Sequence, residues 1–329
     1  MKLLVIGGTQ FVGRAFVEEA ARRGDEVTVF HRGASEAADL PDVDHVHGNR
    51  DGQLDRLRGR TWDVVLDTCA YFPRAVREVA ELADAFGSYA LVSTLGVHPD
   101  DMPAGWNEET PTYQAPFPDT EEVTGETYGP LKVACEQEAG RAFGDACLII
   151  RPGYVVGPHD PTDRFTYYVR RAASGGEMLA PGPPDAPFQV VDVRDLAIFM
   201  LDRITARDSG VYGVVGPGEP IAMRDVLATA RDAAGANTTL TWASEAFLNG
   251  LGEVQSWFPM WEPGAGAHTY DAGKAVHAGL RHRPFRDTVG DTLAWDADRG
   301  RPDLRRGVSA RKEAELLSAL HAVADPTGS

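Results

Sequence analysis

Tyr128 and Lys132 have the spacing of a proton-transfer pair. The segment Tyr128-Gly129-Pro130-Leu131-Lys132 predicts the opening of a helix, and an i, i+4 spacing puts both side chains on one helical face. A cation beside a phenol stabilises the tyrosinate, which can then exchange a proton with a substrate hydroxyl or carbonyl. With nine tyrosines and four lysines in the chain, about 0.1 such pairs are expected by chance. Proton transfer is therefore favoured over two solvated residues at a helix start.

Ser93 and Thr94 follow an apolar run at 90–92 that predicts a buried strand. Ligands of parallel α/β sheets bind beyond the carboxyl ends of the strands. The Thr94 hydroxyl, or that of Ser93, can therefore donate to the substrate oxygen that Tyr128 protonates. The alternative is a turn-forming Ser-Thr pair. We predict Thr94, Tyr128 and Lys132 as the catalytic residues.

Residues 7–13 predict a dinucleotide cradle. They lie between the strand expected at 2–6 and the helix expected at 11–23, where a glycine turn lets pyrophosphate approach a helix N-terminus. Gln10 replaces the middle glycine of the usual pattern, and an ordinary turn is the alternative. The predicted pyrophosphate-binding residues are Gly7, Gly8, Gln10, Phe11 and Val12.

The second expected strand ends in Phe30-His31-Arg32-Gly33, without the acid that usually binds the ribose hydroxyls of NAD. Arg32, with His31 and Arg14, can face a ribose 2′-phosphate instead. The sequence therefore favours NADP(H), with NAD(H) as the alternative and a solvated Arg32 as the other interpretation.

Apolar runs alternate with helical patterns through the first half of the chain, which predicts a Rossmann-like, doubly wound parallel sheet of the α/β class. The expected strands are 26–30, 64–66, 90–92 and 147–150, and the expected helices are 74–86 and 129–143. A helix at 192–203 and a strand at 211–215 return to this domain, so the smaller C-terminal substrate lid is discontinuous. We expect a dinucleotide-binding domain at 1–155 with 189–216, a lid at 156–188 and 217–295, and a helical tail at 296–329.

Composition and charge exclude several classes of protein. The chain has 329 residues and a formal net charge of -17, which disfavours nucleic acid and anionic membrane surfaces as partners. Three widely spaced cysteines argue for a reducing compartment. No apolar stretch approaches the roughly 20 residues of a membrane span, and the N-terminal apolar run is too short for a signal peptide. We expect a cytoplasmic protein, and the histidine spacing predicts no metal site.

Taken together, these motifs resemble the extended and atypical short-chain dehydrogenase/reductase superfamily, in its NAD-dependent epimerase/dehydratase branch. The resemblance covers almost the whole chain. Its most specific marks are Val5-Ile6-Gly7-Gly8-Thr9, the Ser93-Thr94 strand end, Tyr128 with Lys132, Arg151-Pro152-Gly153, and the segments 188–197 and 290–295.

The resemblance implies roles for further residues by position. Thr94, Tyr128 and Lys132 match the Ser/Thr-Tyr-Lys active site of the family. Arg164 is the best candidate to bind a substrate phosphate or carboxylate, and Gln189 is expected at the substrate side. The remaining cofactor-binding positions are His31 and Arg32 at the ribose, Asn49 and Arg50 at the adenine, Thr68, Cys69 and Ala70 along the cofactor, Ser93 at the strand end, and Pro152 and Gly153 at the nicotinamide.

These residues predict an NADP(H)-dependent oxidoreductase that transfers hydride at a ketone or alcohol centre. The close alternative is an NAD(P)-dependent sugar-nucleotide epimerase, which uses the same residues, and a small-molecule substrate follows from either. A 4,6-dehydratase is disfavoured because Thr94-Leu95-Gly96 lacks an Asp-Glu pair beside the hydroxyl. A non-catalytic dinucleotide- or RNA-associated protein is the second alternative. Many relatives form homodimers, but no sequence feature identifies one here.

Overall fold

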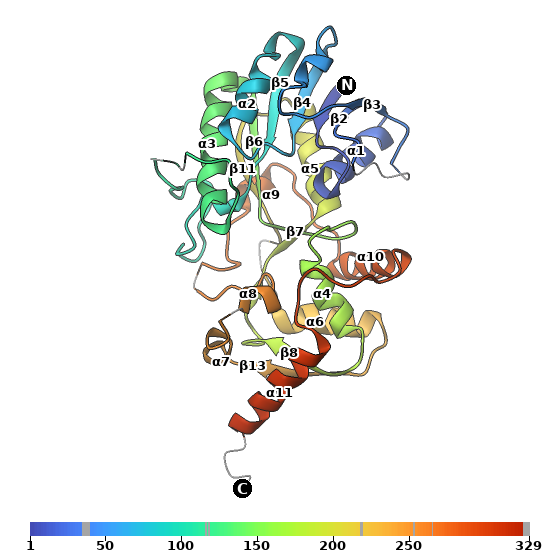
Figure 1. Cartoon of the computed structure of the whole chain (residues 1–329), viewed down its shortest axis with the longest axis vertical. Helices are drawn as coiled ribbons and strands as arrows, with labels where there is room; N and C mark the ends of the chain where they lie inside the picture. Colours follow the sequence, from blue (N-terminus) through green and yellow to red (C-terminus); the bar gives the residue numbers. More distant parts are fainter. Residues whose placement is uncertain are drawn as a thin grey trace.

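The computed structural model describes residues 1–34, 40–115, 117, 119–217, 220–252, 254–264 and 266–324. Within them, seven strands form one parallel sheet in the order β11-β6-β5-β4-β1-β2-β3 (Figure 1). The direction in which successive strands are added reverses beside β1, and doubly wound sheets bind ligands at such a reversal. The strands are β1 (Lys2–Ile6), β2 (Glu26–His31), β3 (Asp44–His47), β4 (Trp62–Asp67), β5 (Phe86–Val92), β6 (Cys147–Pro152) and β11 (Gly210–Val214).

Successive residues of these strands point to opposite faces of the sheet, and because they are apolar on both sides, both faces are buried. Leu3 and Val5 face a core formed with α1 (Phe11–Arg22) and α5 (Val193–Thr205). Leu4 and Ile6 face the opposite core, against α2 (Pro73–Ala80) and α3 (Gly125–Phe143). This two-sided burial explains why the strands are apolar runs and not alternating patterns.

A separate apolar core, called the second core below to distinguish it from the two cores on the sheet, lies beyond the carboxyl ends of the strands, in the lower half of Figure 1. The aromatic residues Phe165, Tyr168, Phe188 and Phe258 are buried in it. Its helices are α4 (Arg164–Ala172), α6 (Met223–Ala233), α7 (Glu245–Asn249), α8 (Val254–Trp257), α10 (Phe285–Asp298) and α11 (Ala310–Ala324). Its strands pair as β8 (Gly176–Pro181) with β13 (Thr238–Ala243), β9 (Pro187–Phe188) with β12 (Ile221–Ala222), and β7 (Tyr154–Val156) with β10 (Val190–Asp192).

The predicted fold class is confirmed, whereas two predicted helix boundaries are wrong. α2 ends at Ala80, and residues 83–85 form a 3₁₀ turn before β5. α3 begins at Gly125, four residues before the predicted start, because Thr124 and Thr127 form a capping box. Pro130 therefore lies inside the helix and not in its first turn.

The C-terminal region contributes to the core on the α1 side of the sheet and to the second core. Helix α9 (Gly273–His277) lies on β11, and Ala275 and Leu280 join the core of the α1 side. Leu316 and Leu317 of α11 pack in the second core. Residues 325–329 of the expected tail lie outside the described residues. Within the described part, no helix is long and apolar enough to cross a membrane.

Candidate active site

Thr94 and Tyr128 lie side by side at the carboxyl end of β5. Thr94 caps the 3₁₀ turn η3 (Leu95–Val97), where its hydroxyl oxygen accepts a hydrogen bond from the Gly96 N–H at 3.0 Å. A Cβ on Gly96 would contact both side chains, at 3.4 Å from Oγ1 of Thr94 and 3.7 Å from Cε1 of Tyr128. The two side chains thus border the same space, where both hydroxyls could bond one substrate oxygen.

Close packing of two glycines allows this pairing. A Cβ on Gly129 would lie 2.2 Å from the Gly96 carbonyl oxygen and 2.7 Å from Cε2 of Tyr113. Both distances are well inside van der Waals contact, which is about 3.5 Å or more for carbon atoms. Gly129 therefore lets α3 approach η3 closely enough for Tyr128 to reach Thr94.

Lys132 lies one helical turn after Tyr128 and is almost completely buried. Its ammonium donates to the Val92 carbonyl at 2.8 Å and to the Ala70 carbonyl at 2.9 Å. These carbonyls lie at and just beyond the ends of β5 and β4, so the cation bridges the two strand ends. Burial lowers the pKa of Lys132, and the nearby carboxylates of Asp67 and Glu136 oppose that effect.

The pKa of Tyr128 lies above its usual value because burial disfavours the phenolate. The hydroxyl of Thr94, and after it the charge of Arg164, act in the opposite direction on this pKa. The Lys132 ammonium, which was predicted to stabilise the tyrosinate, donates to the Ala70 and Val92 carbonyls. Arg164 is a cation whose charge favours the tyrosinate.

The Gly7 turn has the shape that a dinucleotide requires. Gly7 has a φ of +89°, and a Cβ there would lie 2.6 Å from Oγ1 of Thr68 and 3.0 Å from Sγ of Cys69. Gln10 precedes α1 in extended conformation and makes no side-chain cap, so the first N–H groups of α1 are not capped by it. Gly8, Phe11 and Val12 surround this helix start, and the cradle fits a pyrophosphate at a helix N-terminus.

The end of β4 is tied to this turn and to a buried ion pair. The Thr68 hydroxyl donates to the carbonyls of Ile6 and Gly7, at 3.0 and 3.1 Å. The Arg50 guanidinium makes a bidentate pair with the buried Asp67 at 2.8 and 2.9 Å. Its side chain thus supports the 68–70 segment, and the adenine contact expected of Arg50 stays a prediction.

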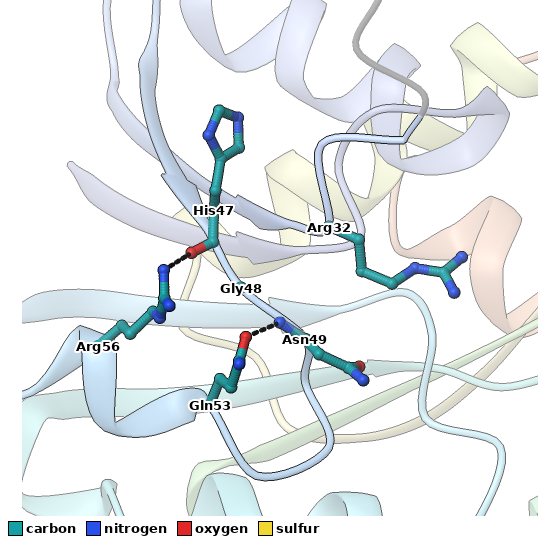
Figure 2. A pocket seen from close by; sticks show the side chains of 6 residues that line it. All are labelled: Arg32, His47, Gly48, Asn49, Gln53 and Arg56. Carbon is teal, nitrogen blue, oxygen red and sulfur yellow. Dashed lines mark hydrogen bonds between the residues drawn. The ribbon is translucent and has the colours of Figure 1, made fainter.

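A cavity of about 330 Å³ opens at the ends of β2 and β3, where the adenosine ribose was expected. It is lined by Arg32, His47, Gly48, Asn49, Gln53 and Arg56, with no carboxylate among them. In Figure 2 the side chains of Arg32 and Asn49 extend to the same side, and Arg56 bonds the His47 carbonyl at 2.9 Å. The neighbouring His31 ring accepts from the Gly33 N–H at 3.1 Å and bonds His45 at 2.8 Å.

Two other predicted residues are engaged within the protein. The Ser93 hydroxyl donates to Glu136 at 2.5 Å, and Glu136 is paired with the buried Arg151. The Gln189 amide donates to the Tyr270 carbonyl at 2.9 Å and accepts from the Tyr270 N–H at 3.0 Å. These bonds tie both side chains into the protein, and the ligand roles expected of Ser93 and Gln189 stay predictions.

Arg164, at the first turn of α4, joins the second core to the Tyr128 region. Its guanidinium carbon lies 5.1 Å from the centre of the Tyr154 ring, and its Nε donates to Thr162 at 3.1 Å. Burial raises the pKa of both Tyr128 and Tyr154, and the charge of Arg164 opposes that effect in each. An anionic substrate group at Arg164 would therefore lie near the phenol of Tyr128.

A sequence model of the NAD dependent epimerase/dehydratase family matches residues 3–215. The chain belongs to this family. The match includes the Gly7 turn, Thr94, Tyr128 and Lys132, and it makes the protein an enzyme of the epimerase/dehydratase type. No curated protein matches the chain.

Solved structures share the fold of this epimerase/dehydratase family member. A UDP-glucose 4-epimerase superposes with a TM-score of 0.70 at 16% identity and covers 94% of this chain and 100% of its own. The UDP-glucose 4-epimerase of Thermus thermophilus, solved with NAD, has a TM-score of 0.64 at 19% identity over 90% and 98%. WbmG of Bordetella bronchiseptica, solved with NAD and UDP, has a TM-score of 0.67 at 19% identity over 94% and 98%.

Several residues near the epimerase/dehydratase site were missed by the sequence analysis. Tyr71 lies beside Tyr128, and Tyr154 lies beside Arg164. In the sequence, Tyr71 comes just after Ala70 and Tyr154 just after Gly153, which are both predicted site residues. That adjacency is the signal that could have identified them. Gly153 itself is required by packing, since a Cβ there would lie 2.8 Å from Cγ2 of Val215. Within the described residues, no group of His, Cys, Asp and Glu is arranged to hold a metal.

Proposed function

We propose that this enzyme epimerises a carbinol carbon of a nucleotide-linked hexose through a keto intermediate. The adjacent side chains of Thr94 and Tyr128, with Lys132 one turn away at the sheet's carboxyl end, carry this proposal. Family membership and the resemblance in fold to UDP-glucose 4-epimerases support it over the oxidoreductase predicted first. The alternative interpretation of the sequence is thus the better supported one.

Tyr128, Thr94 and Arg164 have separate roles in the proposed reaction. Tyr128, as tyrosinate, takes the proton from the substrate hydroxyl, and the same phenol returns it when the keto oxygen is reduced. Thr94 donates to that oxygen and fixes its position. A dinucleotide held at the Gly7 turn would supply reversible hydride transfer at the carbinol carbon. Arg164 binds the diphosphate of the substrate and favours the tyrosinate by its charge.

NAD is the dinucleotide that we propose for this cycle, since the Thermus thermophilus and Bordetella bronchiseptica structures carry it. Three features of the chain support binding of a dinucleotide: the tight Gly7 turn, the α1 N-terminus that the Gln10 side chain does not cap, and the cavity at Asn49. The amides of Asn49 and Gln53 can hydrogen-bond to ribose hydroxyls in place of a carboxylate.

Turnover of UDP-hexoses by the wild type and by Tyr128→Phe tests the proposal. We expect interconversion of UDP-glucose and UDP-galactose, or of their N-acetylated forms, by the wild type, and a loss of about 10²–10⁴-fold in Tyr128→Phe because general acid–base catalysis is removed. Dinucleotide affinity should stay unchanged. Tyr212→Phe on β11 is the matched control and should remain fully active. Full activity in Tyr128→Phe would reject the mechanism.

A net NADP(H)-dependent oxidoreductase is the second candidate, and the ribose cavity favours it. Arg32 and Arg56 line that cavity without a carboxylate, a composition that suits a ribose 2′-phosphate. Titration of the empty enzyme with NADPH and NADH separates the two functions. Preference for NADPH, weakened in Arg32→Ala, together with consumption of added NADPH by a carbonyl substrate, would support the oxidoreductase.

A further inference from the structure

Tyr71 exposes an aromatic ring beside the proposed reaction centre. The residue is 43% exposed and lies between the end of β4 and the start of α2. Its ring centre lies 6.4 Å from that of Tyr128, with the two planes tilted by 44°. The Lys132 ammonium lies 5.7 Å from the same ring centre. Tyr71 therefore borders both members of the Tyr128/Lys132 pair.

The backbone on both sides of Tyr71 is held firmly. The Ala70 carbonyl accepts from Lys132 at 2.9 Å, and the Phe72 carbonyl accepts from the Ala75 N–H at 3.0 Å. Upstream, the Cys69 N–H donates to Asp67 at 3.0 Å. The exposed ring is thus attached to a segment fixed by the protein and is not at the tip of a free loop.

The Tyr71 hydroxyl is available for a hydrogen bond to a ligand. Among the residues that the structure describes, its hydroxyl has no hydrogen-bond partner, and one part of its ring remains open to solvent. An aromatic side chain with an apolar face and a polar tip suits a ligand that is itself partly apolar and partly hydroxylated. One face of a hexose ring has this character, since its C–H groups gather there while the hydroxyls point outward.

We propose that Tyr71 is a substrate-contacting specificity residue whose ring stacks on the hexose of the nucleotide sugar. A hexose oxygen bonded to Tyr128 leaves the sugar ring within contact of Tyr71, given the short distance between the two aromatic rings. The stacking orients the carbinol carbon for reaction and selects hexoses with an unobstructed apolar face. This inference rests on the proposed function.

Steady-state kinetics of Tyr71→Ala, Tyr71→Leu and Tyr71→Phe test it, with UDP-glucose as the substrate. We expect Tyr71→Ala to raise KM about tenfold, Tyr71→Leu to raise it less, and Tyr71→Phe to stay within about twofold of the wild type, since the ring is kept. Affinity for NAD should be equal in all variants. Val276→Ala, which truncates another exposed apolar side chain far from Tyr128, is the control and should match the wild type.

Two results would overturn the role of Tyr71 while leaving the proposed function intact. One is a KM in Tyr71→Ala within about twofold of the wild type. The other is a loss of NAD affinity as large as the change in KM, which would assign the ring to the dinucleotide. A wild type that converts no UDP-hexose would instead reject the proposed function, and the Tyr71 inference with it.

Discussion

Arg164 connects substrate binding to proton transfer at Tyr128. Its charge lowers the pKa of a phenol that burial otherwise raises. Removing the charge should raise the pKa of Tyr128 further and leave less tyrosinate at any given pH. We therefore predict that the pH profile of kcat for alcohol oxidation moves to higher pH in Arg164→Ala. A pH–rate series between about pH 7 and 10 measures this shift.

Arg164→Lys keeps the positive charge but loses the planar guanidinium. It should retain the wild-type pH profile while KM for the nucleotide sugar rises, because a bidentate contact to phosphate is lost. An identical pH profile in Arg164→Ala and the wild type would show that the charge does not act on Tyr128.

At the scale of elements, the contact between α3 and η3 sets the distance from Tyr128 to Thr94. Gly129→Ala would bring a methyl group to 2.2 Å from the Gly96 carbonyl oxygen, so the helix must move away. Since a displacement of about 1 Å at reacting groups can cost about 10²-fold, we predict a fall in kcat of about 10- to 100-fold in Gly129→Ala. Circular dichroism should show an otherwise folded protein.

Gly140→Ala is the matched control on the same helix. A Cβ at Gly140 meets no atom within 4 Å, so this variant should keep full activity. Its free energy of unfolding should increase by about 0.4–1 kcal/mol, because alanine restricts the unfolded chain. Equal activity of Gly129→Ala and Gly140→Ala would contradict the positioning role of Gly129.

The sequence predicted the parallel sheet and the Thr94, Tyr128 and Lys132 constellation because these depend on local patterns. Apolar runs indicate buried strands, and an i, i+4 spacing fixes two residues on one helix face. It did not predict the internal hydrogen bonds of Arg50, Ser93 and Gln189, because these bonds go to residues distant in sequence: Asp67, Glu136 and Tyr270. The ribose cavity was only partly predicted, because Gln53 and Arg56 come from the turn after β3, a strand that no pattern revealed.

At the scale of the whole molecule, a buried polar network links the sheet to the segment after η3. Glu136 of α3 pairs with Arg151 of β6, and Arg151 lies 3.3 Å from Nε2 of His98. His98 also contacts the Pro111 carbonyl at 3.2 Å and the Trp106 ring. Burial and the charge of Arg151 lower the pKa of His98 below its ordinary 6.5.

This network predicts a loss of stability in mild acid. The unfolded chain binds a proton at His98 near pH 6.5, whereas the folded protein does so only at lower pH. The contribution is therefore complete above pH 6.5 and is lost as the pH falls, at up to about 1.4 kcal/mol per pH unit. Urea unfolding of the wild type and His98→Gln at several pH values should give a flatter dependence in the variant. His277→Gln, on the exposed α9, is the control, and equal slopes in all three proteins would contradict the role of His98.

The measurement that tests the central claim most directly follows the hydrogen at the reacting carbon. UDP-glucose deuterated at C4, or its N-acetylated counterpart, is incubated with the enzyme in ordinary water without added NADPH, and the products are analysed by NMR and mass spectrometry. An epimerase that keeps its hydride on the bound dinucleotide predicts the C4 epimer with deuterium retained at that carbon. Absence of the epimer would contradict the epimerase account. So would a parallel incubation with added NADP⁺ in which the deuterium is recovered in the reduced cofactor together with a free keto product.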